Sequence, residues 1–302
     1  MAIPCVAAFS DVTRLRSYSL HGSCINKQNC IHEIRPRPRD ANEEEDDVEL
    51  FYPVTRRAFM FDNVDDSQET VIIDIRQTSF GCGKLGATIW PSSIALACLL
   101  ATHEYAKELV NRKRVIELGA GCGLPSAYLA RNGQCARILA TDYWEEDQTS
   151  RNDSNRLIAN KLFGSNLIYN VQQSKELTNA SVERLDWHDE MNVMKIASNF
   201  SPDTIIGSDL VYYPIDIIPL LSTLEKLFKA GRAQDALLIS PLPPMSEREA
   251  LPEFRQRLED GELGDDFEVH MDELELLGRK SDADGSDEER YNLLRVRIRR
   301  RS

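Results

Sequence analysis

The sequence predicts an α/β fold: a doubly wound, mostly parallel seven-strand sheet that ends in an antiparallel hairpin. Between residues 115 and 259, short β-branched or apolar runs alternate with longer segments of helical character. Such alternation builds a parallel sheet with right-handed crossovers. After residue 259, two strand-like runs at 267–277 and 291–299 follow each other with no helix between them. We therefore expect these two runs to pair antiparallel.

The central elements can be placed in chain order from the same alternation. The third core strand has two candidate positions, residues 167–172 or the residues just before Leu185. The other expected core strands are residues 115–118, 137–141, 203–208 and 236–240, and the expected helices are residues 124–132, 152–163, 217–229 and 246–259.

The N-terminal third has a different character. Arginine alternates with proline at 35–39, and an acidic run covers 43–49. Proline prevents a helix in the first segment, and the like charges of the second repel one another. We therefore expect residues 1–50 to be a disordered tail and residues 51–302 to form one domain. In that domain a strand is expected at 71–75 and a buried helix at 91–105, where apolar residues surround the helix axis.

Composition narrows the class of protein. The chain has 302 residues and a formal net charge of −13. This charge argues against salt-sensitive binding to a nucleic-acid backbone as the main role and suits a basic polypeptide target. Its seven cysteines include no C-x-x-C pair, so no metal site is expected. Free thiols fit a reducing compartment. We expect a cytoplasmic protein, with the nucleus as the alternative, that is monomeric and has neither a secretory signal nor a membrane span.

The stretch 115–123, Val-Ile-Glu-Leu-Gly-Ala-Gly-Cys-Gly, carries the strongest functional signal. An apolar strand ends near Glu117, and glycines follow at alternate positions before a helix begins. Glycine adopts backbone conformations closed to other residues and lets a ligand approach closely, while the helix N-terminus offers free N–H groups. A dinucleotide fold requires glycine where Leu124 stands. E-x-G-x-G-x-G is instead the pattern of class I, Rossmann-like methyltransferases that use S-adenosylmethionine (SAM).

Two further strand ends carry acids. Asp142 follows the run 137–141, where a carboxylate can accept hydrogen bonds from ribose hydroxyls. Taken alone, that acid is equally compatible with NAD. The run 203–208 is followed by Asp209-Leu-Val-Tyr212 rather than by the Asn/Asp-Pro-Pro-Tyr/Phe of enzymes that methylate amide or ring nitrogens.

With Asp209 and Tyr212 in place, the chain resembles methyltransferase family 16, a group of lysine methyltransferases. The resemblance extends to Gly86-x-x-x-Trp90 upstream and to Leu185-Asp186-Trp187 before the fourth strand. It covers about residues 70–301 and is specific at the level of the family. One departure is Pro91, where many members carry aspartate.

The resemblance implies roles for particular residues. Asp209 and Tyr212 would position the target nitrogen as the catalytic pair, although Asp209 as a structural cap of its loop stays an open alternative. For the two tryptophans the alternative is simple core packing. The residues implied in binding SAM are Trp90, Glu117, Gly119, Gly121, Asp142, Trp187 and Ser208.

The implied function is SAM-dependent N-methylation of lysine side chains in a protein substrate, such as a translation factor or a chaperone. Two alternatives stay open. One is small-molecule N-methylation of the nicotinamide type, and the other is a non-catalytic SAM-fold binding module. The intact glycine turn, Asp142 and the Asp209–Tyr212 pair argue against the binding module, because a decayed enzyme would be free to lose them.

Overall fold

The computed structural model describes most of the chain in eleven segments, and all structural statements below concern these segments. They are residues 14–21, 30–36, 54–61, 70–78, 85–132, 134–144, 154–173, 179–230, 232–243, 249–280 and 288–301.

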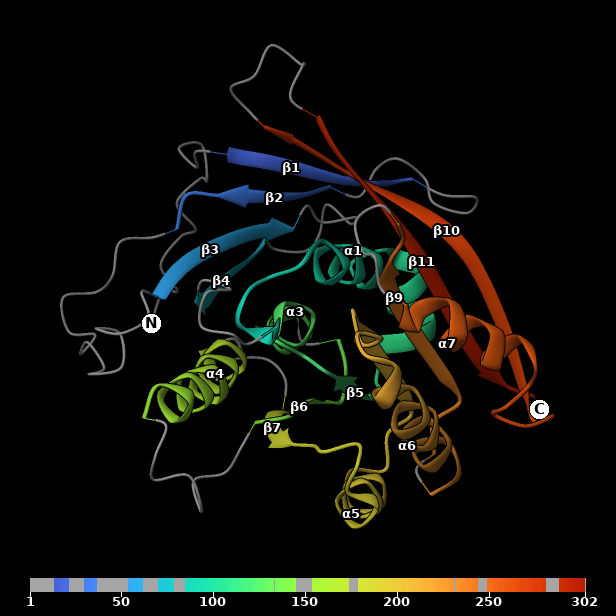
Figure 1. Ribbon diagram of the computed structural model, residues 1–302. Coiled ribbons are helices and arrows are strands. Elements are labelled where there is room, and N and C mark those ends of the chain that lie inside the picture. The colour runs from blue at the N-terminus through green and yellow to red at the C-terminus, as the bar shows by residue number, and fades with distance from the viewer. Residues whose placement is uncertain are drawn as a thin grey trace, which may run out of the picture.

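The described strands form one mixed sheet of eleven strands (Figure 1). Its parallel part has the order β7-β6-β5-β8-β9, and an antiparallel pair, β11 and β10, continues from β9. This part holds seven strands near the expected positions, with the reversed hairpin at its end, but the sheet as a whole has eleven strands rather than the expected seven. The bounds are β5 Arg114–Leu118, β6 Arg137–Asp142, β7 Asn179–Arg184, β8 Thr204–Ser208, β9 Asp235–Pro241, β10 Phe267–Lys280 and β11 Glu288–Arg300.

The third core strand lies just before Leu185, as β7, which is the second of the two positions considered. The other position, residues 167–172, is wrong, because those residues belong to the helix α4 (Ser154–Gln173). Leu167 and Val171 are completely buried, whereas Ile168 between them is 36% exposed. A spacing of four between buried positions is helical, and the short apolar run concealed that period.

The sheet is larger than expected because four strands extend it beyond β10. Their order is β4-β3-β2-β1, and each pairs antiparallel with its neighbour. The expected strand at 71–75 is confirmed as part of the β3–β4 hairpin. The bounds are β1 Arg14–His21, β2 Cys30–Ile34, β3 Val54–Phe61 and β4 Val71–Thr78.

Strands β1 and β2 contradict the expectation that residues 1–50 form a disordered tail. Tyr18 and Leu20 on β1 are each only 2% exposed. Charged residues on the two strands, Arg16 on β1 and Glu33 on β2, are paired with residues of other strands. Arg57 Nε donates to Glu33 Oε1 at 2.8 Å, and Arg16 Nη1 donates to Glu289 Oε2 at 2.7 Å. Because these partners lie far apart in the sequence, no local sequence pattern indicates that the two strands are folded. The acidic run 43–49 lies outside the described residues.

Helices cover both faces of the sheet (Figure 1). One hydrophobic core contains side chains of α1 and α3, and a second contains side chains of α5, α6 and α7. The expected helix at 91–105 is interrupted after Leu100, and the Thr102 side chain caps a new short helix by accepting from Tyr105 N. The bounds are α1 Pro91–Leu100, α2 His103–Tyr105, α3 Leu124–Asn132, α5 Glu190–Phe200, α6 Ile217–Lys229 and α7 Ala250–Glu259, with shorter turns η3 Leu85–Ala87, η4 Ala106–Val110 and η5 Pro214–Asp216.

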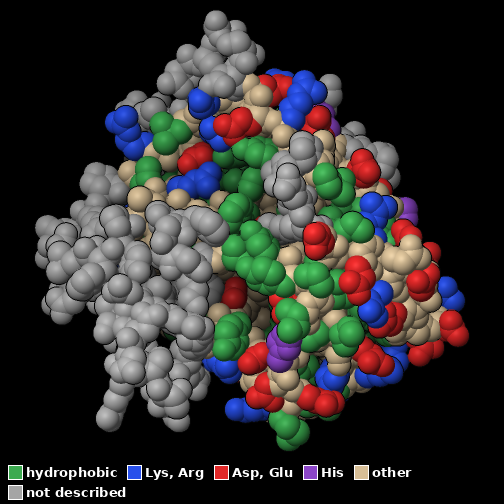
Figure 2. All heavy atoms as spheres, in the orientation of Figure 1, with side chains coloured by type: hydrophobic (Ala, Val, Ile, Leu, Met, Phe, Trp, Pro, Cys, Tyr) green, Lys and Arg blue, Asp and Glu red, His purple; other side chains and the backbone are tan. Residues whose placement is uncertain are grey.

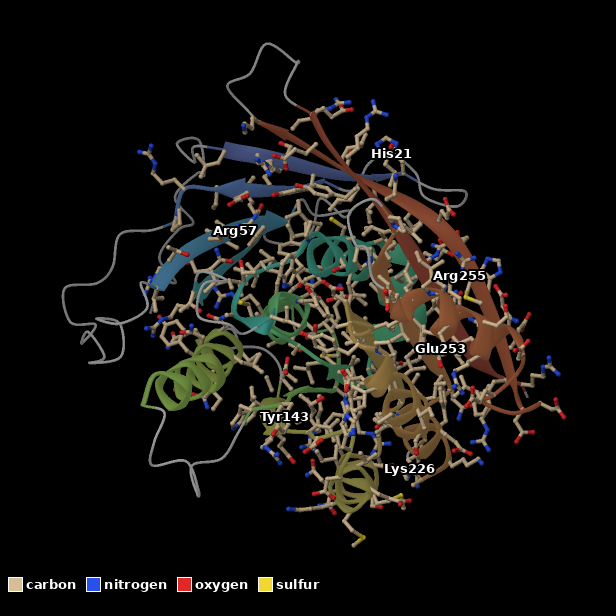
Figure 3. The ribbon with its side chains drawn as sticks, viewed as in Figure 1. His21, Arg57, Tyr143, Lys226, Glu253 and Arg255 are labelled. Atoms are coloured by element: carbon tan, nitrogen blue, oxygen red, sulfur yellow. The ribbon has the colours of Figure 1, made fainter. Side chains whose placement is uncertain are left out.

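Figure 3 shows how side chains from these layers fill the interior between the sheet and its helices. Among the described helices, none combines the length and apolarity needed to cross a membrane.

Candidate active site

A pocket of about 820 Å³ opens at the carboxyl ends of the parallel strands β5, β6 and β8. Strand order reverses between β5 and β8, and ligands of doubly wound sheets bind at such a switch point. The volume falls within the range of small-molecule and cofactor sites. Eight of the nine predicted site residues line the pocket: Trp90, Gly119, Gly121, Asp142, Trp187, Ser208, Asp209 and Tyr212.

The glycine turn after β5 has the geometry that its sequence requires. Gly119 and Gly121 have φ values of 55° and 58°, in the left-handed region that disfavours a side chain. Space is also limited. A Cβ on Gly119 would lie 2.7 Å from Leu210 Cδ2, and one on Gly121 would lie 3.3 Å from the carbonyl oxygen of Gly86. Both the conformation and the close packing therefore account for glycine at these positions.

Asp142 holds this turn from the end of β6. Its Oδ2 accepts a hydrogen bond from Gly121 N at 2.7 Å, and its Oδ1 accepts one from Tyr143 N at 2.7 Å. Burial raises the pKa of Asp142 to about 6, although the two N–H donors oppose that effect. A carboxylate oxygen can accept two hydrogen bonds, so both oxygens keep acceptor capacity toward the pocket.

Glu117 is the one predicted site residue that does not line the pocket. It is completely buried behind the turn, where Oε2 accepts hydrogen bonds from the backbone N and the hydroxyl of Ser126. These bonds join the end of β5 to the first turn of α3. Oε1 has no hydrogen-bond partner among the described residues. Burial accordingly raises the pKa of Glu117 to about 8.

The segment 85–90 closes the pocket from the upstream side. Trp90 Nε1 donates to the carbonyl oxygen of Leu85 at 2.8 Å. The Cys122 thiol, in the glycine turn, donates to the carbonyl oxygen of Gly86 at 3.4 Å. One of these bonds lies within the segment and the other connects the segment to the glycine turn. Thr88 of the same segment also lines the pocket. Leu85, Thr88 and Cys122 were not singled out from the sequence.

Asp186 and Trp187 approach from the loop after β7. Asp186 Oδ1 accepts from His188 N at 3.0 Å, and Asp186 N donates to Asn192 Oδ1 at 2.9 Å, which fixes the loop against α5. The indole of Trp187 lies beside Gly119, within 3.8 Å of where its Cβ would be. Its flat apolar ring therefore forms a wall of the pocket next to the glycine turn.

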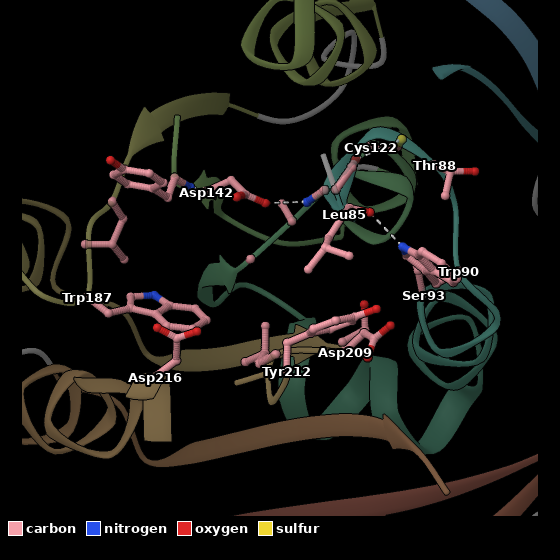
Figure 4. A pocket seen from close by; sticks show the side chains of 18 of the residues that line it. Leu85, Thr88, Trp90, Ser93, Cys122, Asp142, Trp187, Asp209, Tyr212 and Asp216 are labelled. Carbon is pink, nitrogen blue, oxygen red and sulfur yellow. Dashed lines mark hydrogen bonds between the residues drawn. The ribbon is translucent and has the colours of Figure 1, made fainter. Parts of the chain in front are cut away.

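Asp209 follows β8 with a φ of 61°, which is unusual for a residue other than glycine. Its backbone N donates to the carbonyl oxygen of Ile239 on β9 at 2.8 Å. The Tyr212 and Tyr213 rings meet edge to face, with centroids 5.2 Å apart. In Figure 4 Asp142 and Trp187 lie toward one end of the pocket and Trp90 and Asp209 toward the other, with Tyr212 between them.

Several lining residues escaped the sequence analysis. His188 Nε2 and Asp216 Oδ1 are 2.9 Å apart at the rim, and Tyr143 and Tyr213 are half exposed there. No motif marks these positions. The one available signal was adjacency to residues that a motif does mark. Among the described residues no group of three or more potential ligands could hold a metal ion.

The strand order, the reversed hairpin and the glycine turn followed by Asp142 define the class I, Rossmann-like fold of SAM-dependent methyltransferases. The pocket residues fit this cofactor. The pocket could offer the Asp142 carboxylate to the ribose hydroxyls and the Trp187 indole face to the adenine. Its glycine turn would leave room for the methionine part. The family model described as lysine methyltransferase matches residues 67–240, and the chain belongs to that family.

The chain is similar to several named proteins. It is 33% identical over 149 residues to mouse protein-lysine methyltransferase METTL21E, a match that covers 48% of this chain and 52% of the relative. It is 26% identical over 209 residues to the protein N-terminal and lysine N-methyltransferase EFM7 of Debaryomyces hansenii, covering 67% of this chain and 73% of the relative. The chain thus spans about half the length of the mouse relative, 52%, and more of the yeast one.

The chain also matches solved structures at low identity. A SAM-dependent methyltransferase from Anabaena variabilis matches 70% of this chain and 87% of its own, with a TM-score of 0.45 and 16% identity. A complex of DhpI with SAH matches 62% of this chain and 76% of its own, with a TM-score of 0.36 and 14% identity.

Proposed function

We propose that this protein transfers the methyl group of SAM to the side-chain nitrogen of a lysine in a protein substrate. The single observation that carries the proposal is that Asp209 and Tyr212 line the same pocket as the glycine turn and Asp142, in a chain of the lysine methyltransferase family. The names of the mouse and yeast relatives, both lysine methyltransferases, support it.

Three groups would hold the cofactor. Asp142 would accept hydrogen bonds from the ribose hydroxyls, and Trp187 would cover the adenine. Gly119 and Gly121 would admit the methionine part, with Trp90 and Ser208 completing the walls. Glu117 would act indirectly, by fixing the turn through Ser126. When bound, SAM supplies an activated methyl group, so this chain needs no covalent intermediate of its own.

The chain's own task is then to present a lysine nitrogen in line with that methyl group. Holding two reacting groups in a productive geometry can contribute about 7–11 kcal/mol at best. The Asp209 carboxylate would accept a hydrogen bond from the target nitrogen, and the Tyr212 ring would offer its face to the cation. A free lysine has a pKa of about 10.4; loss of water in the pocket would favour the neutral amine that reacts, whereas the nearby carboxylates would favour the ammonium that enters.

The backbone of Asp209 supports this assignment. A left-handed conformation in a residue other than glycine costs on the order of 1–3 kcal/mol and persists where the surrounding structure enforces it. Here Asp209 N donates to the carbonyl oxygen of Ile239, one contact that holds this backbone against β9. Such strain often accompanies functional positions, and Asp209 lines the pocket.

The finer identity of the substrate follows from the family resemblance alone. We propose a translation factor or a chaperone rather than a nucleic acid, and a protein that acts as a monomer. The net charge of −13 supports a basic polypeptide partner. The odd number of cysteines, seven, and the lack of a C-x-x-C pair support a reducing compartment, so we propose the cytoplasm, with the nucleus as the alternative.

The test is incorporation of a radiolabelled methyl group from SAM into a lysate of cells that lack the protein. The label is expected in a polypeptide, and hydrolysis of that band should release methylated lysine. Label confined to small molecules would favour the nicotinamide-type alternative. Tight SAM binding without any transfer would favour the binding module.

A further inference from the structure

Exposed apolar side chains gather at one rim of the pocket. Tyr213 is 53% exposed, Ile215 74% and Ile218 59%, on η5 and the first turn of α6. Tyr213 and the neighbouring Asp216 also line the pocket. We call Tyr213, Ile215 and Ile218 the rim surface. Figure 2 shows hydrophobic side chains gathered in the middle of the face that it draws, with acidic side chains beside them.

The fold does not need the rim surface. α6 already buries a full face against the sheet, including Ile217, Leu220 and Leu224. Ile215 and Ile218 are three positions apart and lie outside this buried face, exposed to solvent. The described residues include seven exposed large hydrophobic side chains, and Tyr143 and the rim surface account for four of them. This concentration beside a pocket is typical of an interaction site.

Charge at the pocket selects the kind of partner. Four aspartates line the pocket: Asp142, Asp186, Asp209 and Asp216. No lysine or arginine is among the described residues that line it. Asp189 and Glu190, which follow the pocket loop, are exposed as well. A partner segment that carries positive charge is therefore favoured over an acidic one.

We propose that the rim surface docks the segment of the protein substrate that carries the target lysine, and that this segment has an apolar residue close to that lysine. The inference rests on the function proposed above. A lysine whose nitrogen reaches Asp209 leaves its backbone at the pocket mouth. A residue two positions away in an extended segment is about 7 Å further along, so it meets Tyr213, Ile215 or Ile218. The basic residues of the same segment would face Asp186, Asp216 and their acidic neighbours.

The experiment uses the full chain with Ile215→Ser and Ile218→Ser combined. Met191→Ser is the matched control, because Met191 is 78% exposed on α5 and does not line the pocket. All three proteins are first compared by thermal melting and by calorimetry with SAM. Both properties should be unchanged in the double variant, since neither isoleucine is buried.

Methyl transfer is then measured with radiolabelled SAM over a series of lysate protein concentrations. The double variant should lose about tenfold in initial rate at low lysate concentration, as expected for two central interface residues. The loss should shrink at high concentration, because docking affects KM rather than kcat. Met191→Ser should behave as the wild type. Mass spectrometry of the labelled site should find an apolar residue within three positions of the methylated lysine, and no acidic residue there.

The outcomes separate this inference from the proposed function. No transfer to any polypeptide by the wild type contradicts the proposed function itself. Transfer by the wild type that is equal in the double variant overturns the docking surface alone. An acidic or wholly polar segment around the modified lysine also overturns it. A wild-type dimer that becomes monomeric in the double variant assigns the rim surface to a second copy of the chain instead.

Discussion

The side-chain amide of Asn170 donates a hydrogen bond to the carbonyl oxygen of Cys122 at 2.8 Å, so helix α4 holds the glycine turn directly. The same amide donates to the carbonyl oxygen of Arg76 at 2.9 Å, and its oxygen accepts from Arg76 N at 2.8 Å. Asn170 is completely buried. A single side chain therefore connects the edge strand β4, the helix α4 and the turn expected to hold the cofactor.

This connection predicts the effect of Asn170→Asp. The carboxylate keeps the shape of the amide but loses both donors and faces two carbonyl oxygens. An unsatisfied or repelled buried group costs about 1–3 kcal/mol. Because one of the lost bonds ends on Cys122, SAM affinity should fall together with the melting temperature. Gln172→Glu on the exposed side of α4 is the control, since it adds the same charge in solvent. Calorimetry that finds normal SAM affinity in Asn170→Asp contradicts this role.

Asp142→Ala tests the cofactor assignment. Losing charge-assisted hydrogen bonds to the ribose and to Gly121 N should cost roughly 1.5–3 kcal/mol, or about 10- to 150-fold in SAM affinity. No NAD binding is expected from the wild type. An unchanged affinity for SAM in the variant, or tight binding of NAD by the wild type, would be incompatible with the assignment.

The pH dependence of SAM binding follows from the same residue. Burial raises the pKa of Asp142 to about 6. Below that pH the carboxyl is protonated and becomes a weaker acceptor for ribose hydroxyls, so SAM affinity should decline as the pH falls from 7 to 5. Titration calorimetry at several pH values measures it. A flat profile would show that Asp142 is ionised throughout that range or does not contact the ligand.

The buried Glu117 should make the protein less stable as the pH rises. A carboxylate whose pKa is lowered by a salt bridge has the opposite effect on stability. Its pKa is raised from 4.5 to about 8 by burial, so the folded state retains a proton that the unfolded state has released. The free energy of unfolding should therefore fall as the pH rises from about 4.5 to 8. Glu117→Gln removes the titrating group and should flatten the curve. Urea denaturation of both proteins between pH 5 and 9 compares them, and parallel curves would contradict the expectation.

The Leu210 side chain leaves no room for a side chain at Gly207, on the strand β8 that leads to Asp209. A Cβ added to Gly207 would lie 2.6 Å from Leu210 Cδ1 and 3.3 Å from the carbonyl oxygen of Leu118. Gly207→Ala should therefore destabilise the protein by about 1–3 kcal/mol through overpacking. Adding Leu210→Ala should recover part of that loss, measured as a coupling energy in a double-mutant cycle. Strictly additive effects would show that the strain lies elsewhere.

The elements that sequence could predict are those with a local period or a local motif. The parallel strands, the reversed hairpin and the glycine turn all have one, and the pocket brings together eight residues that the motifs marked. Strands β1 and β2 have none. Their charged residues pair with Glu289 and Arg57, far away in the chain, so in isolation they resembled a solvated tail.

The remaining pocket residues could not be predicted because they, too, depend on long-range contacts. Cys122, His188 and Asp216 belong to the site through hydrogen bonds to Gly86 and to each other, which only the folded chain brings together. Asn170 was unremarkable in the sequence because a buried amide in a helix has no signature of its own. The left-handed backbone of Asp209 likewise depends on its bond to a neighbouring strand.

Asp209 and Tyr212 are the two residues proposed to hold the lysine that receives the methyl group. Asp209→Asn is the sharpest variant, because asparagine tolerates the left-handed backbone of this position. Tyr212→Phe, which keeps the ring, is the milder companion to Tyr212→Ala. SAM affinity should stay near that of the wild type in all three, since none is expected to hold the cofactor.

The deciding measurement is the rate at which methyl groups pass from radiolabelled SAM to lysine in a lysate, at saturating SAM. The rate in Asp209→Asn should fall about 100-fold or more, since misplacing the attacking nitrogen by an ångström can cost that much. Tyr212→Ala should lose more activity than Tyr212→Phe. Full transfer to lysine by Asp209→Asn, with normal SAM binding, would contradict the account and remove the residue from the mechanism.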